Sequence, residues 1–244
     1  AATNLKVGTL FPMSSEWGKA LQLWEAHVTS KSSGAVKLTF DSTTWTDEDA
    51  LVEALRKGQV EGAVLHARSA GKLFPSLAAL ELPLYRKWTS LDKAREALGA
   101  ELEAAAFNSN LSIAGYFDIG SMRWLSRDAA ILQPEDLKTR KVAKFRWDLL
   151  ANKLDTALGI NGLEIPWSTV LTHLGAKTLD VLHVPIVLAE ALTWTSQLTH
   201  ANEHVSGLSN GVAVFSRIRF DLVPPVHKGL IVDGARATFT NTLN

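Results

Sequence analysis

The sequence has 244 residues, of which 46% are hydrophobic and 20% are charged, so it can form a packed core and is not a disordered chain. Its 25 basic residues balance 25 acidic residues, so no overall charge draws the chain to nucleic acid or to an anionic membrane surface. The absence of cysteine excludes disulfides, thiolate catalysis and cysteine-ligated metal sites. No apolar run reaches the roughly 20 residues that a membrane-spanning helix needs.

Hydrophobic periodicity predicts strands and helices that alternate along the chain. We expect strands at 5–11, 36–40, 61–65, 111–118, 124–125, 141–145, 163–165, 179–184 and 205–215. We expect helices at 15–31, 46–58, 91–107, 148–158, 169–174 and 187–198, with a turn into a short helix at 133–137. This alternation is typical of an α/β protein with largely parallel sheets.

The pattern of one segment of the sequence is repeated about 119 residues later. Residues 55–63 (LRKGQVEGA) read as a helix end, a tight turn and an acidic residue that enters a strand. Residues 174–182 (LGAKTLDVL) repeat that arrangement. Two similar units far apart in the chain indicate two lobes of similar build.

The start of the chain leaves its processing open. Ala1 and Ala2 are preceded by no charged or apolar leader, which fits a mature protein whose signal peptide or lipoprotein leader has been removed. It fits a chain trimmed at its start equally well. A lipid anchor ahead of Ala1 is therefore one alternative, and the lack of cysteine is compatible with an oxidising compartment.

Local motifs for common chemistries are missing. The sequence contains no dinucleotide-binding glycine motif, no P-loop, no HExxH and no GxSxG. His200 and His204 have the spacing of two metal ligands on one helix face, but 205–207 (VSG) indicates that a helix has ended there. We expect no metal, no cofactor and no nucleic-acid partner, and we interpret the basic stretch 138–146 as a solvated surface.

Several stretches, in order and spacing, resemble one family: the extracytoplasmic solute-binding proteins of TRAP transporters, of the DctP type. The matching stretches are Trp17, 34–38, 47–48, 55–63, 74–77, 82–83, 120–123, 134–138, 157–159, 167–170, 179–181 and Pro185. Family members usually continue for some tens of residues beyond the stretch that matches 220–224. We therefore expect either reduced C-terminal helices or a cut chain.

The resemblance implies a two-lobed α/β periplasmic-binding-protein fold, type II-like, with a ligand cleft between the lobes. Lobe 1 would be residues 1–118, to which 205–244 return, and lobe 2 would be 119–204. The protein would be a periplasmic monomer without catalytic activity. It would hand its ligand to a membrane transporter or to an accessory periplasmic protein.

Two departures from the family concern the ligand. Members that bind organic acids carry an arginine that grips the ligand carboxylate, and that position is Ala143 here. An asparagine that faces the ligand in the family is Val184 here. Because a carboxylate buried without its cation is costly, these replacements indicate a largely apolar ligand: a lipid, a sterol or other isoprenoid, or a fatty or aromatic acid.

Eight tryptophans also favour an apolar or flat ligand. Trp167 falls where the family presents an aromatic ring to the ligand. Other candidates lie at strand ends or on the crossing strand, and we expect Arg68 to be exposed. The full set of candidate ligand-binding residues is Met13, Ser14, Trp45, His66, Tyr116, Asp118, Arg123, Ala143, Trp147, Trp167, His183 and Val184.

Three alternatives stay open. A conventional TRAP-type binder would hold a carboxylate through Arg123, Lys144 or Arg146. A hydrolase-like enzyme on the same fold would need His66, His183 and Asp118 in one cleft. A scaffold or sensor that lost its ligand would show a collapsed or water-filled cleft. The sequence does not identify the ligand, the transporter or the tryptophans that face the cleft.

Overall fold

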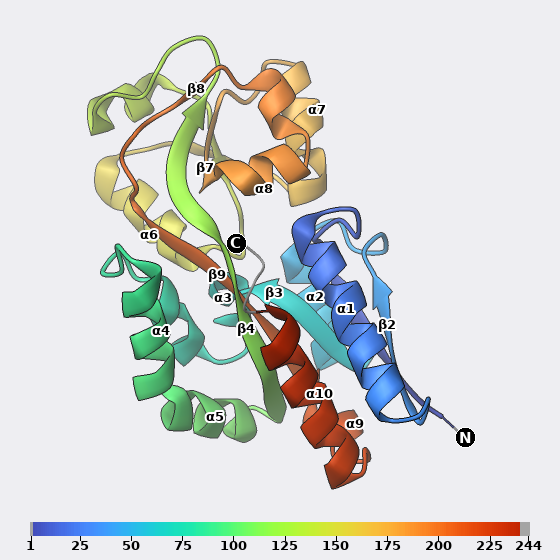
Figure 1. Cartoon of the computed structure of the whole chain (residues 1–244). Coiled ribbons are helices and arrows are strands. Elements are labelled where there is room, and N and C mark those ends of the chain that lie inside the picture. The colour runs from blue at the N-terminus through green and yellow to red at the C-terminus, as the bar shows by residue number, and fades with distance from the viewer. Residues whose placement is uncertain (1, 240–244) are drawn as a thin grey trace.

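The computed structural model of the chain describes residues 2–239, which form one mixed sheet of nine strands with helices packed around it (Figure 1). The strands are β1 (Thr3–Thr9), β2 (Val36–Asp41), β3 (Gly62–His66), β4 (Leu111–Ser126), β5 (Val142–Lys144), β6 (Gly162–Glu164), β7 (Val181–Pro185), β8 (His200–Ala201) and β9 (Gly207–Ser216). The α-helices are α1 (Glu16–Lys31), α2 (Glu48–Arg56), α3 (Ala67–Ala70), α4 (Trp88–Ala97), α5 (Gly99–Asn108), α6 (Leu149–Leu158), α7 (Val170–Gly175), α8 (Ile186–Ala191), α9 (Arg217–Phe220) and α10 (Pro225–Phe239). Short 3-10 helices are η1 (Pro75–Glu81), η2 (Pro134–Thr139), η3 (Trp167–Thr169) and η4 (Trp194–Gln197).

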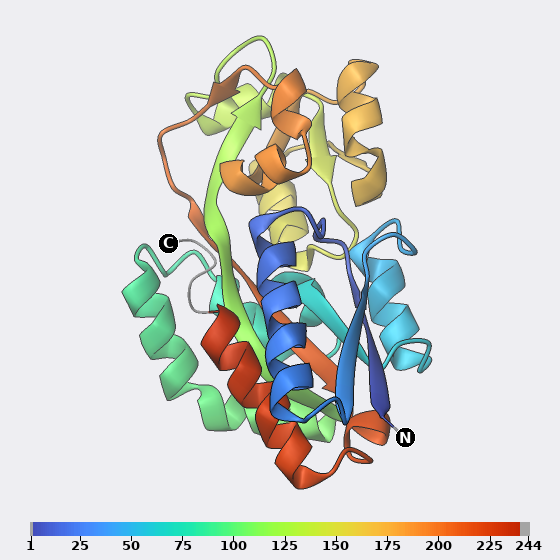
Figure 2. The same ribbon diagram turned by 45° about the vertical axis from the view of Figure 1, so that its right-hand side comes forward.

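The sheet extends through two lobes. Its strand order is β2-β1-β3-β9-β4-β7-β5-β6, and β8 pairs with β4. The parallel strands β1–β3 form the body that we call the first lobe, and the parallel strands β5–β7 form the second lobe. The long antiparallel strands β4 and β9 lie side by side and connect the two (Figures 1 and 2).

Strand β4 is longer than the sequence pattern predicts. The two predicted strands at 111–118 and 124–125 are one strand of 16 residues. It pairs with β9 from Leu111 to Met122 and with β7 from Met122 to Ser126, with a register shift between Asp118 and Gly120. A Cβ atom at Gly120 would lie 2.7 Å from Cβ of Pro185, so glycine lets β4 pass close to β7 at this point.

Three other expectations are corrected. The sheet is mixed rather than largely parallel, because β9 runs antiparallel to β3 and β4, and β4 antiparallel to β7. The predicted helix at 91–107 is two helices, α4 and α5, which meet at Leu98. The predicted helix at 187–198 stops at Ala191, since Thr193 has a left-handed φ of 62° that an α-helix cannot accommodate.

Helices cover both faces of the first lobe. Helix α1 begins where the side chain of Ser15 accepts a hydrogen bond from the amide of Gly18. Its buried Trp24 donates from Nε1 to the carbonyl of Ile231 in α10 at 2.8 Å, so α1 and α10 pack together on one face (Figure 2). Alternate residues of β9 serve the two faces: Phe215 packs in the core under α1 and α10, and Val212 packs in the core under α2, η1 and α5.

The repeated sequence segment corresponds to a repeated structural unit. Helix α2 leads through Gly58 (φ 69°) into β3, and α7 leads through Lys177 (φ 59°) into β7. In each lobe the strand is followed at once by a short helix, α3 or α8. The carboxyl ends of β3 and β7 are the places where an open α/β sheet binds ligands.

Strand β9 offers a stability test, because a Cβ atom at Gly211 would collide with the ring of Phe117. We expect Gly211→Ala to lower the free energy of unfolding by about 1–3 kcal/mol, measured by urea denaturation. Gly175, at the end of α7, has no atom near its would-be Cβ. Gly175→Ala is the matched control and should change stability by at most about 1 kcal/mol, in the stabilising direction. Equal losses in both variants would contradict this account.

Candidate ligand-binding site between the lobes

A cavity lies between the lobes at the carboxyl ends of β3 and β7. Both lobes contribute to its wall, which consists of His66, Arg68, Met122, Phe145, Trp147, Asp148, Trp167, His183, Val184, Pro185, Leu188 and Ser209. We call it the central cavity. The space that the centre of a water molecule can reach is about 20 Å³, which is enough for about one water. Side chains from both lobes therefore fill most of the cleft in this closed arrangement.

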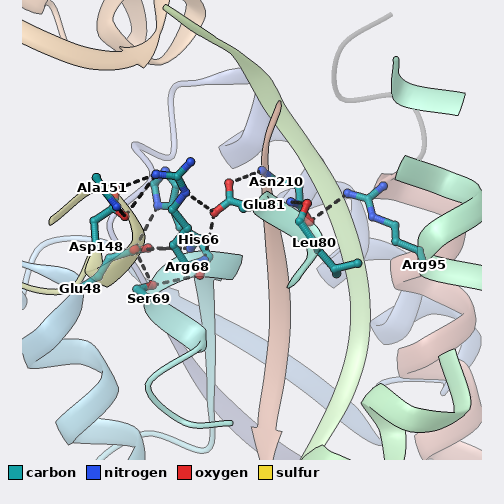
Figure 3. A network of polar contacts seen from close by, with 10 residues as sticks. All are labelled: Glu48, His66, Arg68, Ser69, Leu80, Glu81, Arg95, Asp148, Ala151 and Asn210. Carbon is teal, nitrogen blue, oxygen red and sulfur yellow. Dashed lines mark hydrogen bonds and ion pairs between the residues drawn. The ribbon is translucent and has the colours of Figure 1, made fainter. Parts of the chain in front are cut away.

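Arg68 is a buried, positively charged residue in the wall of the central cavity. Its Nη1 lies 3.2 and 3.1 Å from the two carboxylate oxygens of Asp148, and its Nε lies 3.2 Å from Oε2 of Glu81 (Figure 3). Glu81 is itself fixed, because its other oxygen accepts from the amide of Asn210 at 2.9 Å. Burial alone would lower the pKa of Arg68, but Asp148 and Glu81 outweigh it and raise that pKa. Arg68 is a buried, permanently cationic group.

Glu48 and His66 form a second buried pair near Arg68. Glu48 lies 3.0 Å from Nδ1 of His66 and accepts hydrogen bonds from the amide of His66 and from the hydroxyl of Ser69 (Figure 3). Burial by itself lowers the pKa of His66, but the charge and hydrogen bond of Glu48, with help from Glu81 and Asp148, raise it. The ring of His66 is thus held rigidly at the cavity wall with a bias toward its protonated form.

Three kinds of contact close the cleft. The Arg68–Asp148 ion pair joins α3 of the first lobe to the residue that caps α6 of the second, where Asp148 accepts from the amide of Ala151. The ring of His66 lies 5.2 Å from that of Trp147 and 5.0 Å from that of Trp167. A backbone hydrogen bond of 3.1 Å joins the amide of Ser168 to the carbonyl of Thr46. An ion pair, aromatic contacts and a backbone hydrogen bond therefore all join the two lobes.

Three buried donors in the wall make no hydrogen bond within ordinary limits among the described residues: Nε of Arg68 and the indole nitrogens of Trp147 and Trp167. Nε of Arg68 still forms an ion pair with Glu81, and Trp147 lies close enough to Asp47 to lower the pKa of that carboxyl, so Trp167 is the donor left without either kind of partner. Buried N–H groups are almost always paired. Together with the Arg68 guanidinium, the indole N–H groups make this cavity suited to an oxygen-bearing anion.

His183 carries no charge at this site. Its ring stacks on Trp124 with centroids 4.2 Å apart, and its Nε2 lies 2.6 Å from the hydroxyl of Ser206. Burial, with a smaller contribution from Arg68, lowers the pKa of His183 to about 3. The side chain is therefore a neutral, fixed part of the wall.

The structure brings some of the sequence candidates together. His66, Trp147, Trp167, His183 and Val184 all line the central cavity. Ala143 lines an adjoining cavity in the second lobe. Whether these residues contact a ligand stays a prediction.

Six other candidates lie outside the central cavity. Asp118 pairs with Arg95 at 2.9 Å, and Arg95 lies over the ring of Tyr116. Arg123 donates to the carbonyls of Asn202 and Glu203. The remaining three pack elsewhere: Met13 and Trp45 lie against the cores of the first lobe, and Ser14 is exposed. With Asp118 held by Arg95, the cluster of His66, His183 and Asp118 that the hydrolase alternative needs is not assembled.

Arg68 and its partners are the residues that sequence reasoning missed. We expected Arg68 to be exposed, and that expectation is wrong: its side chain is 10% exposed. Its partners lie 13 and 80 residues away in the sequence, so no local pattern connects them. One signal was available: Glu81 stands within an apolar loop, between Leu80 and Leu82, where a carboxylate needs a buried partner.

A larger open groove of about 470 Å³ lies between α2 and residues 164–166. Most of its charged side chains are paired with one another, Arg56 with Glu53, Lys72 with Asp49, and Arg146 with Glu164, whereas Asp47 forms no ion pair among the described residues and burial raises its pKa to about 6. Such solvated pairs bind little. The central cavity, with its buried cation and unpaired donor, is the better candidate.

Comparison with known families decides the class of protein. The family of bacterial extracellular solute-binding proteins, family 7 (DctP), matches residues 7–240. The chain belongs to this family. Among curated proteins, no sequence matches it significantly.

Solved structures of TRAP periplasmic solute-binding proteins share the fold of this family 7 protein. The protein from Sulfurospirillum deleyianum with bound succinate is 18% identical, with a TM-score of 0.88 over 98% of this chain and 78% of that one. The protein from Desulfovibrio salexigens with bound orotic acid is 15% identical, with a TM-score of 0.88 over the same shares. A sugar acid binding protein from Advenella mimigardefordensis in complex with galactonate is 17% identical, with a TM-score of 0.89 over 99% and 78%. The predicted family and two-lobed α/β fold are confirmed.

In the part of the chain that the structure describes, no helix combines the length and apolarity needed to span a bilayer.

Removing Arg68 tests the ion-pair network. Arg68→Met leaves the buried carboxylates of Glu81 and Asp148 without their cation, so we expect a loss of about 3–5 kcal/mol in the free energy of unfolding. The control is Arg146→Met, which removes an exposed arginine paired with Glu164 and should leave the unfolding midpoint unchanged. Similar midpoints for both variants in urea denaturation would refute the structural role of Arg68.

Proposed function

We propose that this family 7 protein is the periplasmic solute-binding component of a TRAP transporter and captures a small organic acid between its lobes. The observation that carries the proposal is Arg68, a buried guanidinium in the wall of the central cavity that faces both lobes. The similar proteins of known structure bind succinate, orotic acid and galactonate. The protein would act by binding and release, and would deliver its ligand to the membrane component without catalysis.

Exchange of carboxylates at Arg68 supplies a mechanism. When the lobes separate, Asp148 moves away with the second lobe and Arg68 turns toward solvent. A ligand carboxylate then takes the two-oxygen contact that Asp148 makes in the closed arrangement. The indole N–H groups of Trp147 and Trp167 supply further donors to its oxygens. Closure buries the ligand and strengthens each of these interactions.

The apolar ligand indicated by Ala143 and Val184 is not supported. Ala143 was interpreted as the loss of the arginine and Val184 as the loss of an asparagine from the site, but Arg68 would provide a cation from the other lobe. The organic-acid alternative therefore replaces it, with Arg68 in place of Arg123, Lys144 or Arg146.

We also propose that the moving bodies are residues 1–118 with the C-terminal segment from 205, and residues 119–204. The register shift of β4 between Asp118 and Gly120 supports this division. A β-bulge interrupts pairing and permits bending, and this one lies at the boundary between the two proposed bodies. A monomeric periplasmic protein that docks on a membrane transporter fits this arrangement.

Binding measurements test the proposal. Wild-type protein would be titrated with succinate, galactonate, orotate and simple monocarboxylates, with tryptophan fluorescence and calorimetry as readouts. We expect saturable binding of at least one acid, and a loss of about 30-fold or more in Arg68→Lys, which keeps the charge but loses the planar fork. Arg146→Lys is the matched control and should bind like the wild type.

A bound lipid or sterol would contradict the proposal. Organic extraction of the purified protein and mass spectrometry would detect a bound lipid or sterol. If such a molecule is found, rebinds to the stripped protein and is insensitive to Arg68→Lys, the organic-acid proposal fails and the apolar reading returns.

A further inference from the structure

A second cavity adjoins the central one inside the second lobe. Phe145, Asp148 and His183 line both cavities, so one small molecule could reach from one into the other. Ala143 forms part of the wall of the second cavity, and its short side chain leaves the neighbouring polar groups uncovered. We call this space the lobe-2 cavity.

The lobe-2 cavity contains a carboxyl group without a protein partner, in a residue that is mostly buried but whose carboxylate oxygens still reach solvent. Asp155 lines it and is only 6% exposed, and its side chain makes no hydrogen bond or ion pair among residues 2–239. Burial raises the pKa of Asp155 to about 6, the charge of Asp148 adds to this shift, and Lys144 opposes it. Lys144 also lines the cavity but forms no ion pair with Asp155.

A second acceptor stands one turn away on α6. The Oδ1 atom of Asn152 is buried and receives no hydrogen bond, while its Nδ2 donates to the carbonyl of Phe145 at 3.1 Å. Asp155, Asn152 and Asp148 thus present oxygen atoms to the same small space. His183 brings no positive charge, since its pKa is lowered to about 3.

A buried oxygen atom that receives no hydrogen bond lowers the stability of the folded protein. A buried carboxyl or amide oxygen without a donor loses its water and gains nothing in return. A folded protein keeps such groups where water, an ion or a ligand completes them, or at functional and strained sites. The missing partner must be a donor, and since Asp148 is already paired with Arg68 while no ion pair joins Lys144 to Asp155, a positively charged donor would suit Asp155. The aromatic wall formed by Trp124 and Phe145 also suits a cation.

We propose that the lobe-2 cavity binds a protonated amino group, so that the ligand of this protein is an amino acid rather than a plain organic acid. This inference rests on the proposed function for the carboxylate half, which Arg68 would hold. Asp155 and Asn152 would hold the ammonium, and Asp148 would lie between the two ends. The positively charged nitrogen of the ligand would thereby supply the donors that the chain itself does not place there.

Paired ligands test the amino-group site directly. The probes are L-glutamate with glutarate, L-phenylalanine with 3-phenylpropanoate, and L-leucine with 4-methylpentanoate, titrated by calorimetry at pH 7. We expect at least one amino acid to bind tenfold or more tightly than its deamino partner. Asp155→Asn should remove that preference and leave the affinity for the deamino acid unchanged. Asp233→Asn, which alters an exposed aspartate on α10, is the control and should keep the preference.

The outcomes separate this inference from the proposed function. If deamino acids bind as tightly as their amino acids, or Asp155→Asn keeps the preference, the amino-group site is overturned and the carboxylate site stands. If none of the six probes binds, this inference is overturned, and the wider panel of acids given above decides the proposed function separately.

Stability supplies a readout that needs no ligand. The folded protein keeps a proton on Asp155 up to about pH 6, whereas the unfolded chain loses it near pH 4. The ionisation of Asp155 therefore lowers the stability of the wild type as pH rises through this window, and this contribution is absent in Asp155→Asn. We expect the variant to melt at the same temperature as the wild type near pH 4 and several degrees higher at pH 7. A lower melting temperature at pH 7 would mean that Asp155 has a structural partner, and would overturn the inference.

Discussion

The Arg68 guanidinium is the interaction on which the arrangement of this protein depends. A buried cation is stable only where carboxylates surround it, and here one carboxylate comes from each side of the cleft: Glu81 from the first lobe and Asp148 from the second. The first pair fixes Arg68 against β9 through Asn210. The second pair lasts only while the lobes are closed. The same residue thus belongs to the core of one lobe and to the contact surface of the other.

The connecting strands determine how that contact can change. β4 and β9 pass through both lobes, and the register shift in β4 between Asp118 and Gly120 interrupts its pairing with β9 just before β4 begins to pair with β7 at Met122. Bending there would separate Asp148 from Arg68 and unstack Trp147 and Trp167 from His66. A ligand that replaces these contacts restores the closed arrangement, which is the differential interaction that coupling of binding to closure requires.

Much of the fold was predictable because its signals are local. The periodicity of Trp17, Leu21 and Trp24, the cap at Ser15 and the repeated helix–turn–strand segment each depend on residues close in sequence. His66 could be placed at the cleft because strand ends in α/β folds bind ligands, and Trp167 because the family resemblance implies an aromatic ring there. The antiparallel course of β9 and the role of Arg68 could not be predicted, since both depend on partners far along the chain. Ala143 and Val184 were misleading for the same reason: a charge lost from one lobe can be supplied by the other.

The ligand-free protein provides the most direct test that Arg68 and Asp148 link the lobes. Small-angle X-ray scattering would compare the wild type with Asp148→Asn, which keeps a good helix cap but removes the charge that faces Arg68. Asp180→Asn is the control, because Asp180 pairs with Arg140 within the second lobe. The account predicts a larger radius of gyration for Asp148→Asn alone, with all three proteins folded. An unchanged radius in Asp148→Asn would contradict it.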